Sequence, residues 1–181
     1  MCYRRVGHSD EAQLFFVRKD GSYVTDKPCF GGYLSSGFFE PRIMDDKIVV
    51  SFKGMDSFTC NVLNVNTGKF MLEKNVYNIQ IHETYSLIDT GSRKMICDKD
   101  LNDLFPNYNF RSVDYAGDID NELIFFYCET YAGKYSIFSN QGKQITQVWF
   151  ETPLSYLKDN KFKVKDNGNE FYIDLNGNIV N

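Results

Sequence analysis

The sequence predicts an all-β fold of repeated three-stranded antiparallel meanders, forming a small propeller-like or solenoid-like array. Three observations lead to this prediction. Tyrosine and phenylalanine are abundant, with 12 and 16 copies in 181 residues, and both favour strands. Asn, Asp and Gly, the residues of tight turns, recur at short intervals. One hairpin pattern is repeated along the chain, which we interpret as a single β-repeat domain spanning residues 1–181.

The repeated element is a hairpin with an anchor residue in its turn. The five anchors are Gly21, Gly68, Leu101, Gly142 and Gly177, separated by 47, 33, 41 and 35 residues. The five copies lie near residues 14–25, 60–72, 95–105, 135–146 and 170–181. Glycine at four of the anchors allows the positive φ that such turns require. Leu101 lacks this freedom, so we expect a divergent turn in which Asn102 takes the left-handed conformation.

Positions on both sides of the anchor agree between the copies. An apolar or aromatic residue stands five positions before each anchor and three positions after it. The earlier positions are Phe16, Leu63, Ile96, Ile137 and Tyr172, and the later ones are Val24, Met71, Leu104, Ile145 and Val180. Four positions before the anchor the residue is again apolar, except at Asn64. This agreement predicts that the five hairpins share one geometry.

A further strand precedes several of the hairpins and completes the meander. Such strands are predicted within 45–54, 120–133 and 158–170, where Phe162 and Val164 alternate with lysines. The repeating unit is therefore about 35 to 45 residues long, a length typical of propeller blades and stacked β-repeats. All four prolines fall in connecting segments, at Pro28, Pro41, Pro106 and Pro153.

The last hairpin, 169–181, raises the question of what stabilises it, because an isolated hairpin is marginal in water. We expect it to dock on the preceding meander or on the copy near Gly21. Its residues Tyr172 to Gly177, followed by Val180, resemble the core of the WG-repeat (KWG-type) β-repeat family of bacterial proteins. The resemblance is divergent, since the Trp-Gly pair of that motif is absent from every copy. It implies an all-β repeat domain that acts through binding surfaces, with no fixed enzymatic activity.

Charge and hydropathy exclude several classes of partner. The net charge is −4, with 24 acidic and 20 basic residues, whereas nucleic-acid binding requires clustered Lys and Arg. The densest basic stretch places Lys161, Lys163 and Lys165 at alternate positions, which we interpret as a solvated strand face. No signal peptide or membrane-spanning run is visible, so we predict a cytoplasmic protein without nucleic-acid or membrane partners.

The cysteines and histidines do not indicate a catalytic or metal site. The five cysteines are widely spaced without a CxxC pair, which favours reduced thiols over disulfides or zinc. Cys60, Cys97 and Cys128 lie in predicted strands, where a buried structural thiol is expected. His8 and His82 are each expected to be structural or solvated. We therefore predict no catalytic residue, no metal and no cofactor.

One acidic stretch resembles the start of a calcium loop and leaves that possibility open. Asp98, Asp100 and Asn102 stand at alternate positions, as in an EF-hand. Such a loop requires glycine at its sixth position and glutamate at its twelfth, but Asp103 and Asn109 stand there. The alternative is an acidic turn within the third hairpin copy.

Aromatic residues in the connecting segments are the remaining candidates for function. They are Phe38, Phe39, Tyr108, Trp149, Phe150 and Tyr156, and they either anchor an interface or fill gaps between meanders. We predict a non-enzymatic protein-binding module, for example an inhibitor or immunity-type factor from a bacterium or phage that acts on another protein. The rival prediction is a ligand-binding or hydrolytic β-propeller-like protein with its site in a channel or between repeats. The sequence assigns neither the binding residues nor the oligomeric state.

Overall fold

The computed structural model describes residues 13–14, 16–24, 29–30, 43–53, 58–152, 156–166 and 168–180. Over these ranges all regular structure is β, and no helix is long and apolar enough to cross a membrane. The chain divides into two compact units, residues 1–81 and 82–181, and each is described by itself.

The first unit contains two small groups of antiparallel strands. β1 (Gln13–Leu14) pairs with β2 (Cys29–Phe30). The second group follows chain order through β3 (Ile43–Met44), β4 (Lys47–Lys53), β5 (Phe58–Asn64) and β6 (Lys69–Phe70). β7 (Asn78–Ile81) ends the unit. Its apolar cluster consists of Phe16, Val24, Ile48, Val50 and Leu63, so the first two hairpin copies share one core.

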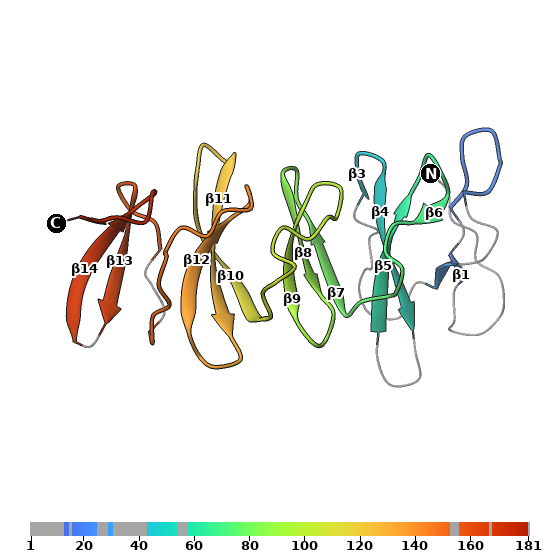
Figure 1. Ribbon diagram of the computed structural model, residues 1–181. Helices are drawn as coiled ribbons and strands as arrows, with labels where there is room; N and C mark the ends of the chain where they lie inside the picture. The colour runs from blue at the N-terminus through green and yellow to red at the C-terminus, as the bar shows by residue number, and fades with distance from the viewer. Residues whose placement is uncertain are drawn as a thin grey trace, which may run out of the picture. The chain divides into compact units, whose positions relative to one another are not determined.

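The second unit contains the longest strands, again paired antiparallel in chain order (Figure 1). They are β8 (Tyr85–Asp89), β9 (Lys94–Asp98), β10 (Phe110–Ile119), β11 (Leu123–Thr130) and β12 (Tyr135–Ser139). A separate three-stranded sheet is made by β13 (Lys161–Asp166), β14 (Asn169–Asp174) and β15 (Ile179–Val180). The predicted all-β fold of repeated antiparallel meanders is therefore confirmed.

Apolar layers cover both faces of the meander β10–β12. Successive side chains of a strand point to opposite faces, and the neighbours Phe125 and Phe126 are both fully buried in β11. Phe126 joins a cluster with residues of the preceding meander, such as Ile96. Phe125 joins a second cluster with residues of β13 and β14, such as Phe162 and Ile173. Burial on both faces explains why β11 is an almost continuous apolar run.

All five anchors lie in turns between paired segments, and four of the hairpins share one pairing across the turn. In three of them the backbone N–H three residues after the anchor donates to the carbonyl five residues before it. These bonds join Val24 to Phe16 at 2.8 Å, Leu104 to Ile96 at 2.9 Å and Ile145 to Ile137 at 2.7 Å. In the last hairpin the equivalent residues, Val180 and Tyr172, pair across β14 and β15. The repeat read from the sequence is thus a repeat of backbone geometry.

The second hairpin differs by one residue from the predicted alignment. There the Met71 N–H donates to Val62 and not to Leu63, because the turn before Gly68 holds one extra residue. Asn64 is consequently the last residue of β5 and opens the turn, where its side-chain oxygen accepts from the N–H groups of Asn66 and Thr67. The assignment of Leu63 and Asn64 to the aligned apolar positions was wrong, and the extra residue explains the single polar exception.

The third hairpin corrects the prediction about its left-handed residue. Leu101 itself has a φ of 69°, whereas the prediction placed Asn102 there. Asp98 supports this turn, since its carboxylate accepts from the backbone N–H groups of Asp100 and Asn102 at 2.8 and 2.9 Å. The Leu101 side chain is buried. Burial and the turn hydrogen bonds together offset the cost of a left-handed leucine.

Within each unit, the anchor glycine of a later hairpin lies against the hairpin before it, at Gly68 in the first unit and at Gly142 and Gly177 in the second. A β-carbon placed on Gly68 would lie 2.3 Å from the carbonyl oxygen of Val24, and one on Gly177 would lie 2.0 Å from that of Ile145. At Gly142 the nearest atom is the Leu104 Cδ2, at 3.9 Å. The partner is in every case the residue three positions after the preceding anchor. Of the two docking sites predicted for the last hairpin, the structure therefore shows the preceding meander.

Gly177→Ala should destabilise the protein by on the order of 3 kcal/mol, since it combines a left-handed alanine with a clash against a backbone carbonyl. Gly133→Ala is the matched control, because Gly133 has a φ of 72° with no atom within 4 Å of a β-carbon. It should cost only about 1 to 2 kcal/mol. Equal losses in chemical denaturation would contradict the close docking of the last turn.

Candidate functional site

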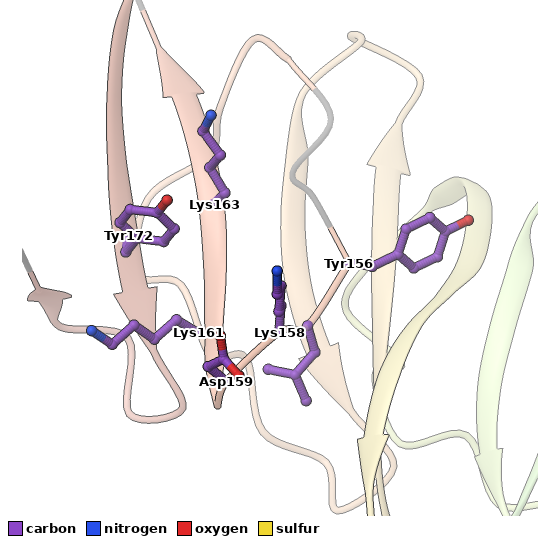
Figure 2. Close-up of a pocket in the computed structure, with 7 residues that line it drawn as sticks. Tyr156, Lys158, Asp159, Lys161, Lys163 and Tyr172 are labelled. Atoms are coloured by element: carbon purple, nitrogen blue, oxygen red, sulfur yellow. The ribbon is translucent and has the colours of Figure 1, made fainter.

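An open groove of about 750 Å³ lies in the second unit, beside the sheet β13–β15. Its lining comes from the segment 156–159 and from strands β13 and β14. The lining residues are Tyr156, Leu157, Lys158, Asp159, Lys161, Lys163 and Tyr172. In the view of Figure 2, the rings of Tyr172 and Tyr156 lie on either side of Lys163 and Lys158. The groove lining therefore contains two tyrosines and three lysines.

The alternation of β13 creates the lysine side of the groove. Phe162 and Val164 are fully buried against the apolar cluster, which directs Lys161 and Lys163 to the opposite face. Lys163 pairs with Tyr172 across the two strands, so their side chains share that face. The predicted half-buried strand with a solvated lysine face is confirmed, and the structure adds that this face borders a groove.

Tyr172 occupies a position that is apolar and buried in the preceding meanders. It stands five residues before its anchor, as Ile96 and Ile137 do, and both isoleucines are 0% exposed. Each of them packs in the cluster shared with the following meander. Tyr172 is 42% exposed, with the lysines of β13 around it. The outward face of β13 and β14 thus differs in chemistry from the equivalent faces inside the unit.

Two of the lysines in the groove carry charge that is not neutralised locally. Lys163 Nζ lies 2.7 Å from Glu170 Oε2, and this hydrogen bond raises the pKa of Lys163 and lowers that of Glu170. Within the described ranges, Lys158 and Lys161 form no ion pair with a carboxylate. Asp159 is the one acidic residue in the lining. The groove is therefore locally positive in a chain of net charge −4.

Contacts with β10 and β11 hold the segment 156–159 in place. The Leu157 N–H donates to the carbonyl of Ala116 at 2.8 Å, and the Leu157 side chain packs against Gly117. The Tyr156 ring is 67% exposed but lies against Tyr127, with centroids 5.8 Å apart. The Tyr127 hydroxyl is buried without a hydrogen-bond partner in the part of the chain that the structure describes, and burial raises its pKa. Tyr156 is thus an exposed ring on a fixed support.

The other predicted connector aromatics fill space between strands. Phe150 is buried and exchanges two backbone hydrogen bonds with Tyr135, both of 2.8 Å. Trp149 packs on Phe138 and Tyr108, and the Tyr108 hydroxyl donates to Gln144 at 2.7 Å. These residues are gap-filling, whereas Tyr156 remains a candidate interface anchor. Phe38 and Phe39 lie outside the described residues.

The acidic stretch of the third hairpin forms hydrogen bonds within its own turn. The second carboxylate oxygen of Asp98 accepts from the Asn102 side chain at 2.8 Å, in addition to the backbone bonds described above. Asp174 repeats this arrangement with Asn178 in the last hairpin, so the same carboxylate–turn hydrogen bonds recur as a feature of the repeat. Burial opposes ionisation of Asp98, but the hydrogen bonds from Asn102 outweigh it and lower its pKa. No group of three His, Cys, Asp or Glu side chains suited to a metal occurs among the described residues.

The cysteines and the described histidine occupy structural surroundings. Cys60, Cys97 and Cys128 are buried and free, as predicted. Burial raises the pKa of Cys60 to about 11 and that of Cys97 to about 12, which opposes a reactive thiolate. His82 stacks on Tyr85 with ring centroids 4.3 Å apart. His8, Cys2 and the side chain of Cys29 lie outside the described residues.

A buried hydroxyl network, which the sequence did not indicate, lies in the fourth hairpin. The Ser136 hydroxyl bonds with the Thr146 hydroxyl and accepts from the Gln144 side chain at 3.1 Å. Ser86 in β8 is equally buried, but its hydroxyl has no partner among the described residues. Ser136 and Ser86 can therefore be compared as buried hydroxyls with and without hydrogen-bond partners among the described residues.

Comparisons with known proteins identify no family. No family model and no curated protein matches the chain. Among solved structures, the crystal structure of BamB from Moraxella catarrhalis matches with 17% sequence identity and a TM-score of 0.33. The match covers 94% of this chain, which spans 60% of that chain.

Ser86→Ala should leave stability unchanged or raise it by about 1 kcal/mol, because it removes a buried polar group without a partner. Ser136→Ala is the control and should cost about 1 to 2 kcal/mol, since Gln144 and Thr146 lose their partner. Both values come from chemical denaturation of the full chain. A larger loss for Ser86→Ala than for Ser136→Ala would contradict the hydrogen-bond assignment.

Proposed function

We propose that the protein is a non-enzymatic protein-binding module that contacts its partner through the groove beside β13 and β14. The observation that carries the proposal is an exposed pair of tyrosines, Tyr156 and Tyr172, in one groove with lysines. Two of these lysines, Lys158 and Lys161, form no ion pair among the described residues. Exposed tyrosines are typical anchors of protein interfaces, because a large rigid ring gives contact area at little cost in entropy.

The architecture supports the same proposal. The meander that carries Tyr172 packs its inner face on a fully buried apolar cluster, and the segment with Tyr156 is hydrogen-bonded to β10. A rigid surface loses little freedom when a partner binds, which favours affinity. Action as an inhibitor or immunity-type factor from a bacterium or phage, in the cytoplasm, is the form of this proposal that we favour. Membership of the WG-repeat family is part of the same proposal.

Affinity purification from the native host tests the proposal. The tagged wild-type chain should recover one protein in stoichiometric amount, and the double variant Tyr156→Ala/Tyr172→Ala should lose it. Tyr131→Ala is the matched control, because Tyr131 is 58% exposed and lies outside the groove lining. It should retain the partner, as exposed residues away from an interface contribute little to binding.

Two outcomes would count against the proposal. Equal recovery of the same protein by the wild type and the double variant would place the interface elsewhere. A bound small molecule in the absence of a protein partner would favour the rival prediction, a ligand-binding or hydrolytic β-propeller-like protein. Thermal unfolding of each variant checks that the loss of a partner does not reflect loss of the fold.

A further inference from the structure

We infer that the groove recognises an extended acidic segment of the partner protein, in which acidic side chains alternate with apolar ones. This inference deepens the proposed function and rests on it. Its starting point is the change of chemistry at the fifth position before the anchor. Ile96 and Ile137 bury that position completely, whereas Tyr172 leaves it 42% exposed beside lysines. Packing of an apolar surface on this face is unfavourable, because burying ammonium groups against apolar atoms is costly. The face therefore suits a polar partner.

The positive charge of the groove favours a negatively charged partner. Glu170 already neutralises Lys163, but Lys158 and Lys161 pair with no carboxylate in the described part of the chain. A partner that supplies carboxylates to these two ammonium groups gains charge-assisted hydrogen bonds. At close range the lysines of the groove also attract these carboxylates, although the chain is negative as a whole. An acidic ligand therefore fits the groove better than a neutral or basic one.

The spacing of the groove residues matches an extended peptide. Lys158 and Lys161 exchange two backbone hydrogen bonds of 2.9 Å, which places their Cα atoms roughly 5.5 Å from each other. Alternate side chains of an extended peptide point to one side about 7 Å apart, a separation that two flexible lysine stems can match. The rings of Tyr156 and Tyr172 offer aromatic surface for the apolar side chains between the acids. The geometry therefore favours an acidic segment in extended conformation over a compact anion.

The same observations disfavour a nucleic acid. Binding of nucleic acids draws much of its affinity from clustered Lys and Arg side chains that neutralise several phosphates. The groove offers two unneutralised lysines, and the net charge of −4 opposes a long polyanion. Binding of a nucleic acid in the groove would therefore overturn the inference.

Fluorescence anisotropy with synthetic peptides tests the inference directly. The probe is a short fluorescein-labelled peptide in which glutamate and leucine alternate, and its control carries glutamine in place of every glutamate. The full chain should bind the glutamate peptide at least about tenfold more tightly than the glutamine peptide, and added salt should weaken that binding. Equal binding of the two peptides, or no binding of the glutamate peptide, would overturn the inference.

Charge-reversal variants assign the binding to the groove. The double variant Lys158→Glu/Lys161→Glu should weaken binding of the glutamate peptide by roughly tenfold or more. Lys165→Glu is the matched control, since Lys165 is exposed on the same face of β13 but does not line the groove. It should change the affinity by less than about threefold, as a distant exposed charge is screened by solvent. Equal losses for the two variants would contradict the assignment.

Two further measurements separate the possible failures. Tighter binding of a labelled oligothymidine than of the glutamate peptide would replace the inference with nucleic-acid binding. If affinity purification recovers a protein that depends on Tyr156 and Tyr172 but the lysine double variant retains it, the proposed function holds and the acidic partner is wrong. Unchanged thermal unfolding of the lysine variants shows that their effect is on binding.

Discussion

The close approach of one hairpin turn to the backbone of the hairpin before it is the constraint on which the rest of the structure depends. At Gly68 and Gly177 the approach leaves no room for a β-carbon, because a carbonyl oxygen of the preceding hairpin occupies that place. Such contact fixes the distance between meanders more tightly than side-chain packing alone. Two requirements therefore select glycine at these anchors: the backbone has a positive φ, and there is no room for a side chain.

Docking at this distance determines which side chains must be apolar. A meander with neighbours on both faces, such as β10–β12, buries successive residues of one strand on opposite sides, so Phe125 and Phe126 are both inaccessible. The sheet β13–β15 packs Phe162 and Ile173 inward and carries lysines and Tyr172 outward. The candidate site follows from that difference, since its lining uses positions that elsewhere hold the core together.

The sequence predicts the repeated elements well and the site poorly, for a physical reason. Hairpins are local, so an anchor glycine and apolar flanks reveal them in one short window. Local patterns fail where one residue changes the geometry, as the extra residue before Gly68 and the left-handed Leu101 show. The groove depends on long-range placement, because a connector brings Tyr156 and Lys158 beside strands that hold Lys163 and Tyr172. The alternating lysines were visible, but nothing in the sequence showed what would lie beside them.

The most direct measurement is the thermal unfolding of the full chain compared with a variant that lacks residues 169–181. The account predicts a clearly lower melting temperature for the shortened chain, because the deletion removes the buried Ile173 and exposes Phe162 and Val164, at about 1.5 to 3 kcal/mol for each side chain. Unchanged unfolding would contradict the account, since the last hairpin would then be an appendage and not a layer that the preceding meander requires.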